Sequence, residues 1–251
     1  MNKSFSKKIV AASIALASVS AFAEWDYYPV LDEHHGQVRL TTEYWYAGDD
    51  HSLAEFVEGR FTVVKGLEVS LKHLGYQFFD DPNDGADENS GFADLTVGLK
   101  YSFNNVFSVF ADANIPPGSD DVSNETFALS GGISWLLPVS EQFGIGNEFK
   151  LTKGFEHDGI TPGLVSTFGL EAYYSFKNGF TPFFGWAFTS QLTDTKNKDG
   201  SKSGTTDSNV SFWAGTSYAV APFLTLTLYE DIEYAGAAYL GGFIFNAVFN
   251  F

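Results

Sequence analysis

From residue 38 to the C-terminus, the sequence alternates between apolar and polar residues in about 12 short segments. Successive side chains of a β-strand point to opposite faces, so each segment predicts a strand with one apolar and one more polar face. Most of these strands approach the ~9–11 residues needed to cross a bilayer obliquely. The predicted strands are 38–46, 57–63, 67–71, 95–103, 107–113, 127–135, 143–151, 168–176, 182–188, 210–218, 224–228 and 239–251.

The connections between these strands fall into short and long classes that alternate along the chain. Short connections are expected at 65–66, 104–105, 138–142, 177–179 and 219–222. Longer ones are expected at 48–53, 80–90, 116–124, 154–163 and 193–208, with a shorter one at 235–238. Bacterial outer-membrane barrels have short periplasmic turns and long extracellular loops, whereas a secreted β-sandwich has no reason to separate its loops by length. We therefore predict an all-β fold, a transmembrane antiparallel up-and-down β-barrel over residues 38–251 with periplasmic termini.

The last predicted strand is exceptionally rich in phenylalanine. One of its faces carries only apolar residues: Phe243, Phe245, Ala247, Phe249 and Phe251. This ending resembles the final strand of Gram-negative outer-membrane barrels, whose last residue is commonly Phe. The resemblance implies a location in the cell outer membrane, surrounded by lipid and lipopolysaccharide. It also implies the barrel assembly machinery as a partner, which would engage the strand that ends at Phe251.

The first 23 residues have the pattern of a secretory signal peptide. Three lysines precede a short apolar run at 9–19, and Ala-Phe-Ala at 21–23 fits the rule for signal cleavage. The apolar run is too short to span a bilayer as a helix. Residues 24–37 follow without a clean period. They predict either a short periplasmic lead-in or a plug folded into the barrel.

The composition argues against several other functions. Cysteine is absent, which rules out thiol catalysis and thiolate metal sites. Cleavage of the signal would lower the net charge from -17 to -20, because three lysines and no acid are removed. Such a charge argues against nucleic acid as a partner, since phosphate binding needs clustered lysine and arginine. No motif such as G-x-S-x-G occurs, so we expect no catalytic residues and no cofactor.

Ionisable residues in the predicted strands fall mostly on the polar phase. A charge at the bilayer midplane costs ~2–4 kcal/mol, so this phase is expected to face the lumen. His73 is an exception on the apolar phase, where a β-bulge would turn it inward. The predicted pore-lining residues are Arg39, Glu43, Trp45, Glu58, Arg60, Lys72, Tyr76, Lys100, Phe110, Asp112, Glu148, Lys150, Glu171, Tyr173, Trp213 and Tyr229. Such a lining suits aromatic or amphiphilic solutes, and salt bridges that stiffen the wall explain its charges equally well.

One loop is a weak candidate for a cation site, although we predict no metal centre. Its carboxylates have a spacing that suits Ca²⁺: Asp80, Asp81, Asp84, Asp87 and Glu88. The loop lacks the full EF-hand pattern. A solvated acidic loop is therefore the simpler interpretation.

Residues 91–103, GFADLTVGLKYSF, carry a second resemblance. They are similar to the G-x-x-D-L-T-x-G-x-K-Y-x-F strand of the MetA-pathway of phenol degradation family of outer-membrane proteins. The resemblance implies an outer-membrane channel for small organic compounds. We therefore predict passive uptake of small solutes. A non-conducting structural or adhesive barrel is the alternative, and a barrel hydrolase is the third possibility.

Overall fold

The computed structural model describes residues 27, 30–48, 50–80, 90–104, 106–119, 123, 125–203, 208–235 and 238–251. The predicted signal peptide, 1–23, lies outside the described residues. Twelve strands are long: β1 (Gly36–Ala47), β2 (Asp50–Val64), β3 (Leu67–Asp80), β5 (Leu95–Ser102), β6 (Phe107–Ile115), β7 (Ala128–Pro138), β8 (Phe143–Gly154), β9 (Leu164–Tyr174), β10 (Phe180–Gln191), β13 (Ser208–Ala221), β14 (Leu224–Ala235) and β15 (Ala238–Asn250). Three have two residues each: β4 (Gly91–Phe92), β11 (Thr195–Lys196) and β12 (Lys202–Ser203). No helix in this described part is long and apolar enough to span a membrane.

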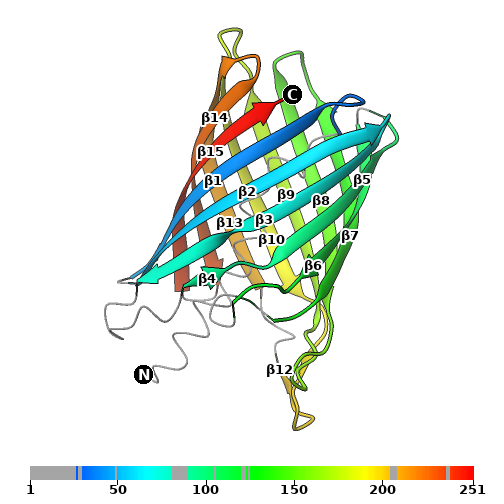
Figure 1. Cartoon of the computed structure of the whole chain (residues 1–251), viewed down its shortest axis with the longest axis vertical. Coiled ribbons are helices and arrows are strands. Elements are labelled where there is room, and N and C mark those ends of the chain that lie inside the picture. Colours follow the sequence, from blue (N-terminus) through cyan, green and yellow to red (C-terminus); the bar gives the residue numbers. More distant parts are fainter. Residues whose placement is uncertain are drawn as a thin grey trace.

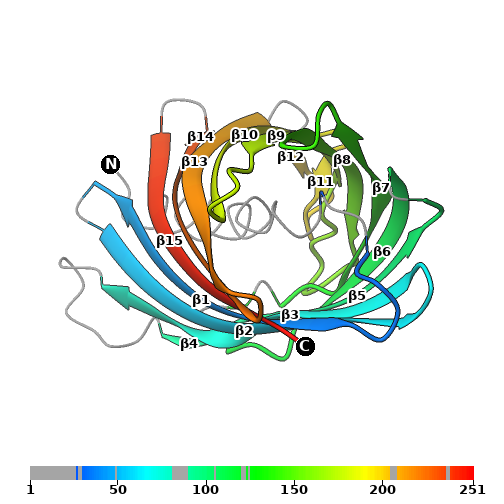
Figure 2. The ribbon, with the colours of Figure 1, turned by 90° about the horizontal axis from the view of Figure 1, so that it is seen from above.

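The long strands form one closed antiparallel barrel (Figures 1 and 2). Each long strand pairs with the next long strand along the chain. The last strand, β15, pairs with β1 from Gln37↔Asn250 to Tyr46↔Gly241, which closes the ring. The predicted up-and-down barrel of about 12 strands is therefore confirmed.

The two ends of the barrel differ in their connections. At one end, called here the short-turn end, all connections are brief: 65–66, 103–106, 139–142, 175–179 and 222–223. The C-terminus lies at this end, which is uppermost in Figure 1. At the opposite, long-loop end, the longer connections are 81–94, 116–127, 155–163 and 192–207.

The long connection predicted at 48–53 is wrong, and the shorter one predicted at 235–238 is briefer still. Only residues 48–49 join β1 to β2, and only 236–237 join β14 to β15. The strand β2 begins at Asp50, several residues before the predicted start at Val57. The reason lies in its hydropathy. Phe56 faces inward and Glu55 faces outward there, so the usual pattern of an outer-membrane strand is reversed.

The barrel is polar inside and apolar outside. Among the described residues, 25 buried polar or charged side chains outnumber 11 buried apolar ones. On β15, Phe243, Phe245 and Phe249 are exposed on the outer face, whereas Ile244 and Asn246 are fully buried, as the sequence phase predicts. This inversion of the soluble pattern is what a bilayer requires of a closed barrel.

A β-bulge in β3 explains the irregular position of His73. The register between β2 and β3 shifts here, and His73 has a φ of 64°. Both Lys72 and His73 consequently face the lumen, where His73 Nδ1 lies 3.2 Å from Thr96 Oγ1. The bulge predicted for His73 is confirmed.

The same bulge makes the prediction for Tyr76 wrong. One extra residue reverses the phase of the rest of the strand. Tyr76 therefore lies on the outer face, where its ring packs against Phe78 at 4.7 Å and Phe92 at 5.3 Å between centroids. Both partners are exposed on that face.

Candidate functional site: the barrel lumen

The inner face of the barrel holds fifteen of the sixteen residues predicted to line a pore, Tyr76 being the exception. Twelve of the fifteen are buried, and Phe110, Asp112 and Tyr173 are half-buried. Sequence reasoning missed several apolar residues on this face, among them Phe56, Phe183 and Leu240. They lie on the polar phase of their strands, and that phase is the signal that could have found them.

Most of the charged residues of the lumen occupy one arc, on β1–β3, β5, β6 and β8, and this arc is called here the charged wall. Two of its ion pairs join adjacent strands, one reaches from β3 to β6 across β5, and one joins successive inward positions of β8. The nitrogen–oxygen distances are 2.5 Å for Arg39–Glu58 and 3.7 Å for Arg60–Glu68, Lys72–Asp112 and Lys150–Glu148.

The pair of Arg39 and Glu58 is the most deeply buried of these. The two residues face each other directly in the register of β1 and β2. Their side chains are 1% and 0% exposed. A charge-assisted hydrogen bond of this kind is strong, and removing one partner leaves the other charge buried without it.

The arc on β1, β10 and β13–β15 carries most of the buried apolar side chains of the lumen, together with the buried acids Asp231 and Glu233 of β14, and is called here the aromatic wall. Its buried apolar members are Trp45, Phe183, Ala187, Trp213, Tyr229, Leu240 and Ile244. The rings of Phe183 and Tyr229 meet edge to face at 5.9 Å, a favourable aromatic geometry. This wall therefore offers aromatic surface over four strands, and β15 adds Leu240 and Ile244.

Two carboxylates accept hydrogen bonds from tryptophans of the aromatic wall. Trp45 Nε1 donates a hydrogen bond of 2.8 Å to Glu43, and Trp213 Nε1 donates one of 2.8 Å to Glu171. Each indole is thereby fixed in orientation, with its polar edge satisfied and its ring surface left for apolar contacts.

Acids outnumber bases on the inner face of the described barrel. Eight carboxylates lie there: Glu43, Glu58, Glu68, Asp112, Glu148, Glu171, Asp231 and Glu233. Five bases accompany them: Arg39, Arg60, Lys72, Lys100 and Lys150.

The segment before β1 passes into the lumen from the short-turn end. The His34 amide donates to the carbonyl of Thr62 at 2.9 Å, and the Val30 amide donates to Ser102 Oγ at 3.1 Å. The Leu31 amide lies 3.4 Å from Glu68 Oε2. These contacts tie the segment to the inner sides of β3 and β5.

Tyr27 lies further along this segment, against the far side of the lumen. It is 4% exposed, and its ring stacks on Trp213 with centroids 6.1 Å apart. Two glycines form its seat, because a Cβ at Gly146 would lie 2.7 Å from Tyr27 Cβ and one at Gly169 would lie 1.9 Å from the Tyr27 hydroxyl. Tyr27 is the lumen residue that sequence periodicity could not find.

No metal-binding geometry occurs on the inner face of the described residues. The one group of three potential ligands in this part of the chain lies in the loops of the long-loop end. The acidic loop carrying Asp81, Asp84, Asp87 and Glu88 lies outside the described residues, as does the side chain of Asp80.

Residues 53–247 match the sequence model of a family described as "Putative MetA-pathway of phenol degradation". The chain belongs to this family. The motif at 91–103 lies inside the matched region, so the resemblance in the sequence is confirmed. A comparison with curated proteins found no match to this chain.

Solved structures share the fold of this family member. The COG4313 outer membrane channel from Pseudomonas putida F1 is 13% identical, with a TM-score of 0.71 over 89% of this chain and 98% of that chain. The NanC porin is 10% identical, with a TM-score of 0.58 over 84% and 98%. The translocator domain of the autotransporter NalP from Neisseria meningitidis is 10% identical, with a TM-score of 0.55 over 97% and 98%. The fold is therefore that of outer-membrane barrels, and these three structures are described as a channel, a porin and an autotransporter translocator domain.

Proposed function

We propose that the protein is an outer-membrane channel for passive uptake of small aromatic or amphiphilic solutes, with the short-turn end and both termini in the periplasm. The observation that carries this proposal is a closed barrel whose lumen has an aromatic wall opposite a charged wall. The family description and the printed name of the COG4313 outer membrane channel support it. The proposal assigns no catalytic role to any residue.

The two walls suit a solute that has an apolar body and a polar group. Binding sites for small organic molecules combine aromatic surface with a few fixed polar groups. Here the rings of Trp45, Trp213 and Tyr229 supply the surface. Glu43 and Glu171 supply fixed acceptors beside these rings. The pore-lining role of the fifteen inner-face residues belongs to the same proposal.

We further propose that residues 24–37 act as a plug rather than as a periplasmic lead-in. Support comes from the stacking of Tyr27 on Trp213 of β13. It also comes from the contacts of Val30 with β5 and of Leu31 with β3, on the other side of the lumen. Their positions carry the segment across the lumen, from β3 and β5 to the seat on β8, β9 and β13. In this proposal Tyr27 narrows the passage beside the aromatic wall.

Uptake of phenylalanine and leucine into proteoliposomes tests the proposed solute class. Both are zwitterions, so they share charge and differ mainly in the ring. We expect the protein to admit phenylalanine ~2–10-fold faster, corresponding to the ~0.5–1.5 kcal/mol that an aromatic pair contributes. Tyr229→Leu, on the aromatic wall, should reduce this preference.

Tyr218→Leu is the matched control, because Tyr218 is 49% exposed on the outer face. It should keep the preference for phenylalanine. Equal uptake of the two solutes by the unmodified protein would overturn the aromatic part of the proposal. Absence of uptake of both would favour the non-conducting barrel.

A further inference from the structure

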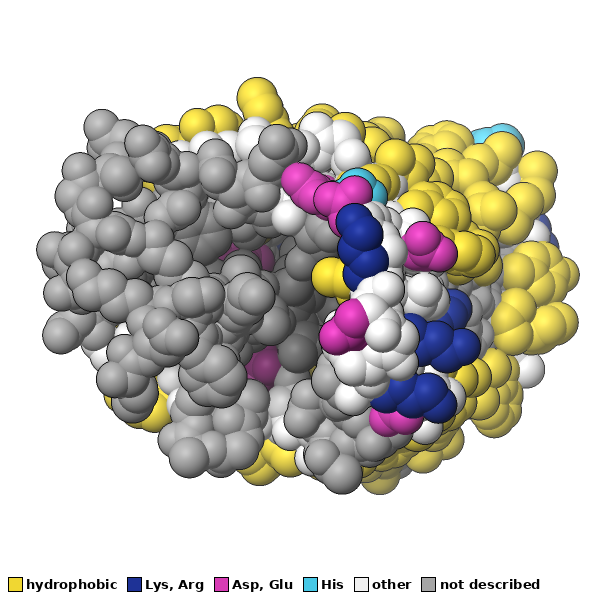
Figure 3. All heavy atoms as spheres, turned by 90° about the horizontal axis from the view of Figure 1, so that it is seen from below, with side chains coloured by type: hydrophobic (Ala, Val, Ile, Leu, Met, Phe, Trp, Pro, Cys, Tyr) yellow, Lys and Arg dark blue, Asp and Glu magenta, His cyan; other side chains and the backbone are white. Residues whose placement is uncertain are grey.

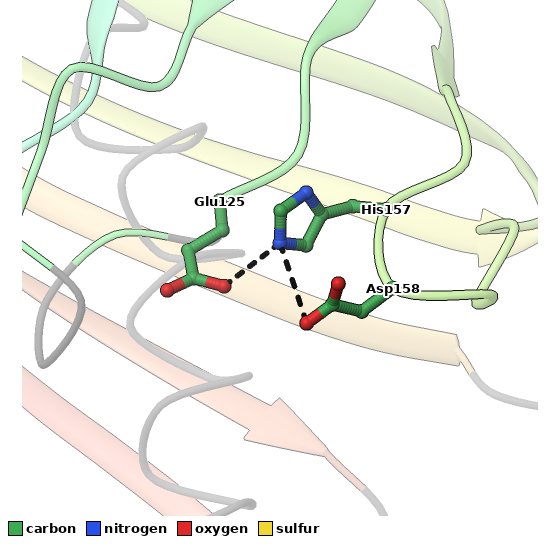
Figure 4. A group of neighbouring side chains, drawn as sticks. All are labelled: Glu125, His157 and Asp158. Atoms are coloured by element: carbon green, nitrogen blue, oxygen red, sulfur yellow. Dashed lines mark hydrogen bonds and ion pairs between the residues drawn. The ribbon is translucent and has the colours of Figure 1, made fainter.

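Three side chains of metal-ligating type converge at the long-loop end, away from the lumen walls (Figure 4). Glu125 comes from the loop between β6 and β7, and His157 and Asp158 come from the loop between β8 and β9. His157 Nε2 lies 2.9 Å from Glu125 Oε2 and 3.8 Å from Asp158 Oδ2. One ligand atom from each residue lies within 4.8 Å of the other two.

We propose that Glu125, His157 and Asp158 bind a first-row transition-metal dication of the Zn²⁺ class and thereby join the two loops. Zinc accepts imidazole nitrogen and carboxylate oxygen at ~2.0–2.2 Å, and tetrahedral geometry then places its ligand atoms ~3.4 Å apart. The distances of 2.9 and 3.8 Å from His157 Nε2 bracket that separation. Water would complete the coordination, as in zinc sites with three protein ligands.

The backbone holds the loop of His157 and Asp158 in place. The His157 amide donates to the carbonyl of Ile160 at 3.0 Å, and the Ile160 amide donates back to the carbonyl of His157 at 2.8 Å. Asp158 has a φ of 50°, a conformation that non-glycine residues seldom adopt. The tight turn therefore presents two adjacent side chains to the same point, which an extended strand would not do.

Glu125 is positioned independently on the other loop. Its amide donates to Ser123 Oγ at 2.8 Å, and its φ is 51°. The two loops are also joined to each other. The Phe155 amide of the β8–β9 loop donates to the carbonyl of Phe127 of the β6–β7 loop at 2.9 Å, and the centroids of the two rings lie 5.4 Å apart. Both loops are thus fixed to each other beside the cluster. Binding would require only adjustment of side chains, which reduces its entropic cost.

The imidazole decides the class of ion. Ca²⁺ and Mg²⁺ prefer ligand sets made of oxygen, whereas imidazole suits Zn²⁺, Cu²⁺ and Ni²⁺. Without metal, a proton on His157 Nε2 can be donated to Glu125 as an ordinary ion pair. A metal ion bound at His157 Nε2 would replace this hydrogen bond with coordination.

The surroundings set the expected strength of the site. Figure 3 looks onto the long-loop end, where acidic, basic and histidine side chains of the described loops lie close together. The stem of Lys198, from the turn between β11 and β12, reaches within 2.9 Å of a Cβ built at Gly159. Because a cationic side chain packs beside the turn, we expect moderate rather than very tight binding.

Isothermal titration of the full mature chain with Zn²⁺ tests the proposal. The protein would carry no polyhistidine tag, and would be refolded in detergent and stripped of metal. We expect one saturable equivalent of Zn²⁺ and no competition from excess Ca²⁺. His157→Ala and Glu125→Gln should each weaken binding by at least ~10-fold, since even residues that only support a metal ligand matter by ~10–100-fold.

Glu156→Gln is the matched control, because Glu156 is an exposed acid of the same loop outside the cluster. It should bind Zn²⁺ as the unmodified chain does. Migration on unboiled gels would verify that each variant forms the barrel. Absence of a saturable equivalent in the unmodified chain would overturn the proposal. So would binding of Zn²⁺ by both cluster variants as tightly as by the unmodified chain.

Discussion

Glu58→Gln is expected to destabilise the barrel by ~3–5 kcal/mol, the usual cost of removing one partner of a buried ion pair. The change removes the negative charge 2.5 Å from the Arg39 guanidinium, where both side chains are almost inaccessible to solvent. It also weakens the acceptor for the His73 amide, which lies 3.4 Å from Glu58 Oε1 at the bulge. Unfolding of the folded barrel in urea, measured from vesicles, would report this loss.

A second substitution on the same strand distinguishes the loss of the buried ion pair from the effect of a Glu-to-Gln change itself. Glu55→Gln makes the same change on the outer face, where Glu55 is exposed and accepts a bond from Thr42. It should not lower the free energy of unfolding, because it removes a charge from the lipid-facing side rather than from a buried pair. The double variant Arg39→Met with Glu58→Met should be more stable than either single variant, because no charge is left unpaired by the change. Equal effects of Glu58→Gln and Glu55→Gln would show that the pair does not support the wall.

Phe245→Arg is expected to block assembly, because it places a charge on the outer face near the middle of β15. Phe245 is 42% exposed there, between Thr42 of β1 and Leu228 of β14. A cation at the bilayer midplane costs ~2–4 kcal/mol, a large part of the stability of a typical domain. The folded fraction can be read from heat-modifiable migration on unboiled gels.

The neighbouring residue supplies the control for this prediction. Asn246 faces the lumen between the short side chains of Thr41 and Thr227. Asn246→Arg should therefore assemble more completely than Phe245→Arg, although both introduce the same cation into the same strand. Comparable assembly of the two variants would contradict the assigned faces of β15.

The barrel could be predicted from the sequence because the alternation of side chains survives in nearly every strand. The final strand shows this most clearly, since the exposed Phe243 and Phe249 keep the phase counted from the C-terminus. Failures occurred where a local feature changes the phase. The bulge at His73 shifts the register against β2, and Tyr76 moves to the outer face. The sequence indicated a bulge at His73, but how far the change of phase extends along the strand depends on pairing with β2, which a single sequence does not contain.

The candidate site was predictable only in part, for a related reason. Inward charges such as Arg39 and Glu58 follow from the phase of their own strands. Tyr27 does not, because its segment has no period and its seat is built from Gly146 and Gly169 on two distant strands. The cluster of Glu125 and His157 likewise depends on two loops that only the closed barrel brings together.

The central claim, a conducting lumen narrowed by Tyr27, is tested most directly by single-channel conductance in planar bilayers. The unmodified protein is expected to conduct weakly, and Tyr27→Ala should at least roughly double its conductance, since the narrowest lining sets the flow through a pore. Gly146→Ala should act in the same direction, because its methyl group would meet Tyr27 Cβ at 2.7 Å. Gly131→Ala, whose methyl group would lie 3.5 Å from its nearest neighbour, should leave conductance unchanged. Absence of conductance in all four proteins, or equal conductance before and after removal of the Tyr27 ring, would contradict the claim.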